Sequence, residues 1–174
     1  LNALLSKAPA LEKLIIIECN KILTPLNEMT PLSALTEVDA SRTKITSEFL
    51  NSLLRVTPSL EELTLEGCRL KSAFTEKLSL KSLKWLSLDA GDINAHYLTT
   101  LLSDAPLLEV LNLSECKTIT GAALEEIKLN SLKELNLTEI PMKRDSLLKI
   151  LENAPNLTHI YVNWQRFDLP DIST

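Results

Sequence analysis

Histidine is the side chain that most often serves as a general base, and this chain has two, His96 and His159. Nucleophilic catalysis needs such a base beside an activated hydroxyl or thiol, oriented by a third group. His96 falls in a predicted helix and His159 in the last predicted strand, each without a recognisable partner. The carboxylates Asp39 and Glu62 could form an acid–base pair or hold calcium, but no glycine turn or ligand cluster supports either chemistry. We therefore expect no catalysis and no cofactor.

The reactive thiols are Cys19, Cys68 and Cys116, which are spaced by 49 and 48 residues. Near-equal spacing indicates a repeated unit. If the chain stacks parallel strands roughly 4.8 Å apart, cysteines two repeats apart lie roughly 10 Å from each other, beyond the roughly 7 Å Cα limit for a disulfide. The same separation argues against a shared metal ion. We predict three unbridged cysteines that pack as small hydrophobes, in a reducing compartment such as the cytoplasm.

A leucine pattern predicts the elements that position these groups. The chain has 38 leucines, and the motif L-x-x-L-x-L, with Val, Ile or Ala allowed at the later positions, recurs seven times. The repeats begin at residues 11, 35, 60, 83, 108, 132 and 157, so that successive steps measure 23 to 25 residues. This period lies in the range of about 20 to 29 residues that is typical of leucine-rich repeats.

Each repeat changes from a strand period to a helical one. The alternation in 111–113 places one set of side chains inward, whereas Leu98, Leu101 and Leu102 share one face of a helix, as do Leu147, Leu148 and Leu151. A proline stands two residues before the first leucine in the odd repeats only. The odd repeats are expected to follow long helices, and the even repeats short ones such as 122–127. The predicted helix N-caps are Asn94, Thr120 and Asp145.

The run 108–124, LEVLNLSECKTITGAAL, resembles the cysteine-containing, ribonuclease-inhibitor-like subfamily of leucine-rich repeats. That subfamily is known from F-box substrate receptors of ubiquitin ligases, and similar repeats occur in effectors that bacteria deliver into the host cytosol. The resemblance implies an α/β fold: a leucine-rich repeat solenoid, wound as a right-handed βα superhelix, with a parallel concave sheet and convex helices. It also implies recognition of another protein, such as a substrate recruited to a ligase, although no F-box is visible in the sequence.

The repeat register predicts which strand side chains point outward, and therefore where a partner would bind. Carboxylates outnumber lysines and arginines six to one at these positions, and several of them surround Trp85. An acidic patch with one large aromatic suits a Lys/Arg-rich segment through charge steering and a cation–π contact; a solvated polar face is the other interpretation. The candidate partner-binding residues are Glu37, Asp39, Glu62, Glu66, Trp85, Asp89, Asn112, His159, Tyr161 and Trp164.

Charge and hydropathy narrow the classes of partner. The net charge of -5 argues against nucleic acid, because phosphate backbones are bound by clustered Lys and Arg. The longest apolar run, 14–17, is far shorter than the roughly 18 residues that span a bilayer. We expect a monomer that binds another protein, and neither nucleic acid nor a membrane.

The repeat pattern also bears on the two ends of the chain. Residues 1–174 form a single domain of seven repeats in this interpretation, but Leu4 and Leu5 match the end of a helix from a preceding repeat. Residues 168–174 are too short to complete the seventh repeat, so we expect a fragment of a longer protein. The alternative is that Trp164, Phe167 and Leu169 fold back as a minimal cap. Two functions remain open: a recognition domain, or a structural spacer that positions flanking domains.

Overall fold

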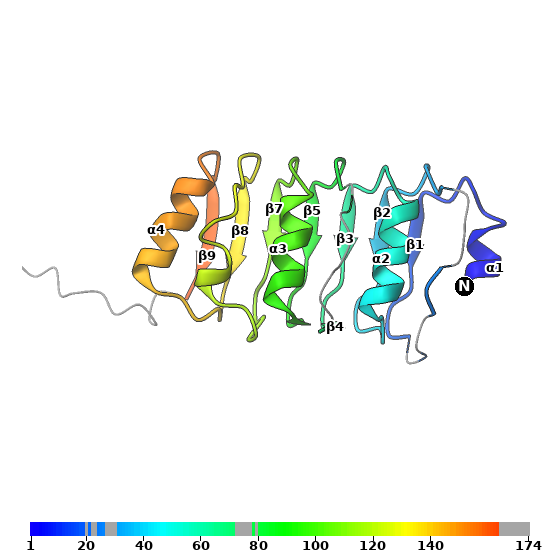
Figure 1. Ribbon diagram of the computed structural model, residues 1–174, viewed down its shortest axis with the longest axis horizontal. Helices are drawn as coiled ribbons and strands as arrows, with labels where there is room; N and C mark the ends of the chain where they lie inside the picture. The colour runs from blue at the N-terminus through cyan, green and yellow to red at the C-terminus, as the bar shows by residue number, and fades with distance from the viewer. Residues whose placement is uncertain (20, 22–23, 27–30, 72–77, 79, 164–174) are drawn as a thin grey trace, which may run out of the picture.

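The computed structural model describes residues 1–163 except 20, 22–23, 27–30, 72–77 and 79. Seven short strands lie side by side along the long axis of the molecule, and three helices cover one side of them (Figure 1). All neighbouring strands in this sheet are parallel and pair in the order β1-β2-β3-β5-β7-β8-β9. The repeats therefore stack in chain order, one strand for each L-x-x-L-x-L motif.

The strands begin two residues after the first leucine of each motif, as the alternation predicts. The central side chains of β2 to β8, such as Leu63 and Leu111, point away from solvent and are fully buried, whereas Ile160 of β9 is exposed. The strands of this sheet are β1 (Lys13–Ile15), β2 (Glu37–Asp39), β3 (Glu62–Thr64), β5 (Trp85–Ser87), β7 (Val110–Asn112), β8 (Glu134–Leu137) and β9 (His159–Val162).

The helices before repeats three, five and seven are long, as predicted, and the segment before repeat six is short; those before repeats two and four lie partly outside the described residues. The long ones are α2 (Ser47–Val56), α3 (Ala95–Ser103) and α4 (Arg144–Asn153), and each ends two or three residues before a proline. A short helix, α1 (Asn2–Leu5), precedes the first strand. In place of the predicted short helix at 122–127, the chain forms a single 3-10 turn, η1 (Gly121–Ala123).

Two predicted helix caps differ from the structure. Asn94 caps α3 as expected, because its Oδ1 accepts hydrogen bonds from the amides of His96 and Tyr97. The prediction that Asp145 is the cap of α4 is wrong, because Lys143 occupies the N-cap position. Asp145 lies in the first helical turn, where its negative charge interacts favourably with the positive end of the helix dipole. Thr120 occupies the N-cap position of η1 without a side-chain bond to it.

The core lies between the sheet and the helices. In α2, Phe49, Leu50 and Leu53 are fully buried, as the helical period predicts. The prediction fails in α4, where Leu148 and Leu151 are exposed. A second, two-stranded parallel sheet pairs β4 (Arg69–Leu70) with β6 (Asp92–Ile93). In the described part of the chain no helix is long and apolar enough to cross a membrane.

The turn after the strand has the same backbone conformation in each of the first six repeats. Its eighth residue, counted from the first leucine of the motif, has a positive φ of 52° to 66°, yet only one of these residues is glycine; they are Glu18, Arg42, Gly67, Ala90, Glu115 and Glu139. Left-handed backbone costs about 1–2 kcal/mol in a residue with a side chain. The conformation is held by the next repeat: the amide of Glu115, for example, donates to the carbonyl of Thr138 at 2.9 Å.

Candidate functional site

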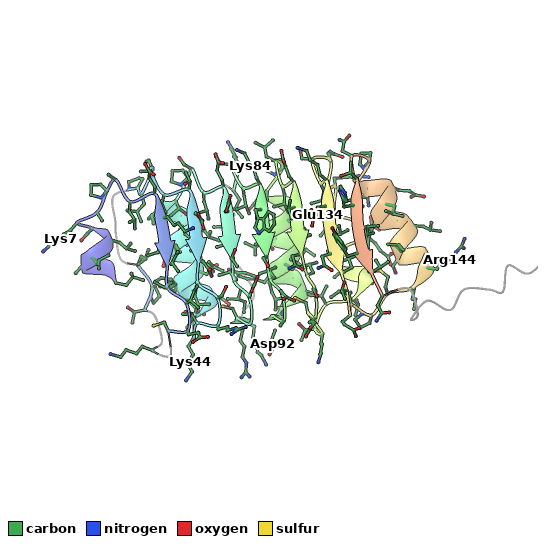
Figure 2. All side chains as sticks on the ribbon, turned by 180° about the vertical axis from the view of Figure 1, so that it is seen from behind. Lys7, Lys44, Lys84, Asp92, Glu134 and Arg144 are labelled. Atoms are coloured by element: carbon green, nitrogen blue, oxygen red, sulfur yellow. The ribbon has the colours of Figure 1, made fainter. Side chains whose placement is uncertain are left out.

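The outward side chains of the seven strands form one continuous surface, called here the strand face, which is turned toward the viewer in Figure 2. Partners in neighbouring strands are in register, so equivalent side chains form rows across the sheet, with strands about 4.8 Å apart. The first row runs Lys13, Glu37, Glu62, Trp85, Val110, Glu134 and His159. The register predicted from the leucines is therefore confirmed.

Trp85 is the large aromatic at the centre of this row. The residue is 41% exposed, and its register partner on the neighbouring strand is Glu62. Among the described residues, the carboxylate of Glu62 forms no hydrogen bond or ion pair. An indole face and an unpaired carboxylate thus lie next to each other on an open surface.

The carboxylates nearer the N-terminal end of the strand face all interact electrostatically with one lysine, Lys13. Lys13 Nζ lies 2.5 Å from Glu37 Oε1. The hydrogen bond to Glu37 raises the pKa of Lys13, and the charges of Glu37, Glu62 and Asp39 raise it further. The carboxylates therefore lie close enough to act together on a cation, although Glu37 already has one as its partner.

Several polar side chains of the second row bind the backbone of the turns that follow the strands. This row runs Ile15, Asp39, Thr64, Ser87, Asn112, Asn136 and Tyr161. Asp39 Oδ1 accepts hydrogen bonds from the amide of Ser41 at 2.9 Å and from its hydroxyl at 2.6 Å. Asn112 Oδ1 accepts from the amide of Ser114 at 3.0 Å. These Asx turns lead into the left-handed residues described above. Two of the candidate binding residues, Asp39 and Asn112, thus have a structural use.

Repeats three and four differ at the same level, where the second row holds Thr64 and Ser87 and the carboxylates come two residues later. Glu66 Oε1 accepts from the Ser87 hydroxyl at 3.2 Å, and that hydroxyl also accepts from Asn112 Nδ2 at 3.4 Å. Asp89 Oδ1 is buried and has no hydrogen-bond partner among the described residues. Glu66 and Asp89 are not needed to cap a turn, and Ser87 is a contact that the sequence did not indicate.

The aromatic group at the C-terminal end is only partly described. His159 and Tyr161 are exposed on β9, and Trp164 lies outside the described residues. At the other end of the strand face, Ile15 and Ile17 are exposed. The structure therefore separates the candidates into a central acidic group around Trp85 and a terminal pair some three strands away.

The cysteines lie behind the strand face. Cys68 and Cys116 are buried, and all three cysteines are free. The thiol of Cys116 donates to the carbonyl of Leu88 at 2.9 Å and that of Cys68 to the carbonyl of Ala40 at 3.1 Å. Burial raises the pKa of Cys116 to about 11 and also raises that of Cys68. Both remain protonated near neutral pH, as expected of packed thiols rather than nucleophiles.

Other polar groups are paired across repeats in ways that the sequence analysis missed. Just before the strands, Lys84 pairs with Glu61 and Lys133 with Glu109, each at 2.8 Å. The alternation of Glu and Lys at the second motif position was the available signal. Within the described residues, no three His, Cys, Asp or Glu side chains gather as a metal site would require.

A cleft of about 590 Å³ lies between η1 and the start of α4, lined by Gly121, Met142 and Lys143 among others. Its carboxylate, Glu125, binds Lys149 Nζ at 2.7 Å and the Ser146 hydroxyl at 2.5 Å. The hydrogen bond from Lys149, followed by that from Ser146, lowers the pKa of Glu125. Because these groups satisfy one another, the cleft is a weaker candidate than the strand face.

One family model matches the chain, over residues 58–171, and its description is the At1g61320/AtMIF1 LRR domain. No curated protein matches the chain. The matched residues begin just before repeat three and include Glu62, Glu66, Trp85 and Asp89, whereas Glu37 and Asp39 precede them. The match covers more than half of the sequence, and the chain belongs to the family of At1g61320/AtMIF1 leucine-rich repeat domains.

Proposed function

We propose that the strand face binds a partner protein through a Lys/Arg-rich segment of that partner. Leucine-rich repeat domains mediate protein–protein interaction, and the extended sheet surface is the part that repeat proteins use for it. The binding surface is the acidic patch, defined as Glu37, Asp39, Glu62, Glu66, Trp85 and Asp89. The observation that carries the proposal is the exposed indole of Trp85 beside the unpaired carboxylate of Glu62.

The chemistry of the patch suits a guanidinium or ammonium group. A cation above the indole is attracted to its face, by about 0.5–1 kcal/mol at an exposed site. Glu62 supplies a carboxylate on the neighbouring strand β3, and Glu66 and Asp89 each lie two residues beyond the second row. Complementary charge of this kind raises the association rate and favours basic over acidic partners.

The proposal extends to the winding of the repeats, the location of the protein and its biological role. The repeats wind as a right-handed solenoid with the strand face on its concave side, and the chain acts in the cytoplasm as a monomer. It recognises substrates for a ubiquitin-ligase adaptor or takes part in the work of a bacterial effector, as the subfamily resemblance implies. It performs no catalysis of its own.

A structural spacer is the second candidate, and one observation favours it. The side-chain oxygens of Asp39 and Asn112 accept hydrogen bonds from backbone amides of the following turns, and Glu37 is paired with Lys13. If the remaining carboxylates only solvate the surface, the domain would hold flanking parts at a fixed distance without binding through this face.

A titration that follows Trp85 separates the two functions. In a Trp164→Phe background Trp85 is the only tryptophan, and its fluorescence is recorded while a synthetic Lys/Arg-rich peptide is added. We expect a saturable change that weakens with salt and that an acidic peptide of equal length does not produce.

The matched variants are Glu62→Lys and Glu152→Lys, which make the same change of charge. Glu62 lies in the acidic patch, whereas Glu152 is exposed on α4. Recognition requires that Glu62→Lys weakens peptide binding and that Glu152→Lys leaves it nearly unchanged. Equal titrations of the two variants, or none in the parent, would favour the spacer.

A further inference from the structure

The carboxylates of the acidic patch do not all remain open to a partner. Glu37 is paired with a lysine, and Asp39 accepts two hydrogen bonds from the turn that follows its strand. The other three are Glu62 and Glu66, in the repeat of β3, and Asp89, in the repeat of β5. Within the patch, the charge that a partner could neutralise is therefore concentrated on two neighbouring repeats.

These two repeats stay in register beyond the ends of their strands. Glu62 is the register partner of Trp85. The parallel ladder continues past the strands, where the amide of Gly67 donates to the carbonyl of Asp89 at 2.8 Å. Glu66 therefore lies beside Asp89, and both are four residues further along the chain than Glu62 and Trp85. We call Glu62 with Trp85 the first pair, and Glu66 with Asp89 the second pair.

An uncharged stretch separates the two pairs. Each residue of a parallel strand rises about 3.3 Å, so four residues place the pairs about 13 Å apart on the same face. Between them lie Thr64 and Ser87, which are register partners, and Ser87 is only 2% exposed. A partner that neutralises both pairs therefore needs two positive charges about 13 Å apart.

The second pair contains an acceptor that lacks a donor. Asp89 Oδ1 is buried and has no hydrogen-bond partner among the residues that the structure describes. The hydroxyl of Ser87 donates to Glu66 Oε1 at 3.2 Å. A buried acceptor without a donor is unfavourable, and a hydrogen bond from a cation to a carboxylate is among the strongest that could satisfy it. The second pair therefore favours a cationic donor by hydrogen bonding as well as by charge.

We infer that the partner's basic segment binds in an extended conformation along β3 and β5, with two basic residues four positions apart, one on each pair. The inference rests on the proposed function. Side chains four positions apart on an extended chain lie on one face and about 13 Å from each other, as the pairs do. In an α-helix four positions span only about 6 Å. The residue on the first pair is an arginine, because a guanidinium stacks on an indole while donating to a carboxylate.

A segment could instead cross the strands, and the strand face offers less for that direction. From Trp85 the first row passes Val110 on β7 before it reaches Glu134 on β8 (Figure 2). That path covers an apolar residue and leaves Asp89 Oδ1 without a donor. In the other direction, Glu37 is already paired. The direction along the strands is the one that satisfies both pairs.

Peptides of one composition but different spacing test the inference. Each is a Gly/Ser/Thr chain with two arginines separated by one, three or five residues, and a fourth, Ala-rich and helical peptide carries them seven positions apart. Binding is followed by the fluorescence of Trp85 in the Trp164→Phe background. We expect the peptide with three intervening residues to bind about two- to five-fold more tightly than the others, the value of one additional exposed ion pair.

Glu66→Gln and Glu134→Gln are matched variants, because each removes one carboxylate from the strand face and keeps the length of the side chain. Glu66→Gln should abolish the preference for three intervening residues while leaving the affinity of a peptide with one arginine unchanged. Glu134→Gln should leave the preference as it is in the parent. Circular dichroism verifies the fold of both variants.

The other outcomes overturn the inference and can be told apart from failure of the proposed function. Equal affinity for all spacings, or a preference that Glu66→Gln does not alter, would contradict binding along the strands while basic segments still bind. Tightest binding of the helical peptide, or a loss of affinity in Glu134→Gln, would assign a helix or a segment that crosses the strands. If none of the peptides binds, the proposed function fails, and this inference fails with it.

Discussion

Repeats three and four differ from repeats two, five and six in what their outward polar side chains do. In repeats two, five and six, Asp39, Asn112 and Asn136 accept a hydrogen bond from the amide two residues later. In repeats three and four that position holds a hydroxyl residue, and the carboxylates of Glu66 and Asp89 stand outside the turn. A polar residue on the strand face is thus a candidate for binding only where the backbone has no use for it.

The largest expected effect concerns a group that serves the fold, the thiol of Cys116. Burial raises its folded pKa from 9.0 to about 11. The stability that it contributes is therefore complete below pH 9 and is lost as the pH rises toward 11, by at most about 2–3 kcal/mol. Urea unfolding at pH 8 and pH 10.5 should show a smaller loss in Cys116→Ala than in the parent. An equal loss in both would remove Cys116 from this role.

Asn112→Ala should lower the free energy of unfolding by about 1–2 kcal/mol, because two hydrogen bonds are lost. Its Oδ1 accepts from Ser114 and its Nδ2 donates to Ser87. Chemical denaturation measures the loss, and Glu62→Gln is the control, with an expected change within about 0.5 kcal/mol. If Asn112 instead serves a partner, Asn112→Ala would keep its stability and lose affinity for the basic peptide.

Asp89→Asn is the opposite case, with the smallest expected change in stability. Because the buried Oδ1 has no partner among the described residues, removing its charge should leave the free energy of unfolding within about 0.5 kcal/mol of the parent, or raise it. Affinity for the Lys/Arg-rich peptide should fall by about two- to five-fold, the value of one exposed ion pair. A clear loss of stability with unchanged binding would move Asp89 into the structural group.

Most of the fold could be predicted because the signal is the burial of leucine at a regular spacing. Strand positions and register follow from the motif, and Leu63 and Leu111 lie in the core as expected. The turns could not be predicted in the same way. Ala90 and Glu115 are ordinary residues in a left-handed conformation, which no local preference indicates, since hydrogen bonds from the next repeat impose it.

The residues of the candidate site could be predicted from the sequence, but not which of them bind the chain's own backbone. The rows that hold Glu62, Trp85 and Asp89 follow from the register alone. Whether a carboxylate or amide faces a partner or its own backbone depends on the turn geometry after the strand, as Asp39 shows. The exposure of Leu151 also lay beyond the pattern, because a helical period does not say whether a neighbouring repeat is present to cover it.

The left-handed turns give the row of repeats a direction. In the first five repeats the amide of this residue donates to a carbonyl of the repeat that follows, as Gly67 does to Asp89 at 2.8 Å and Ala90 to Ser114 at 2.8 Å. The turn of one repeat is thus held by a backbone hydrogen bond to the repeat that follows it in the chain. A break between two repeats would release strained backbone on its N-terminal side alone, so unfolding should travel more readily toward the N-terminus than away from it.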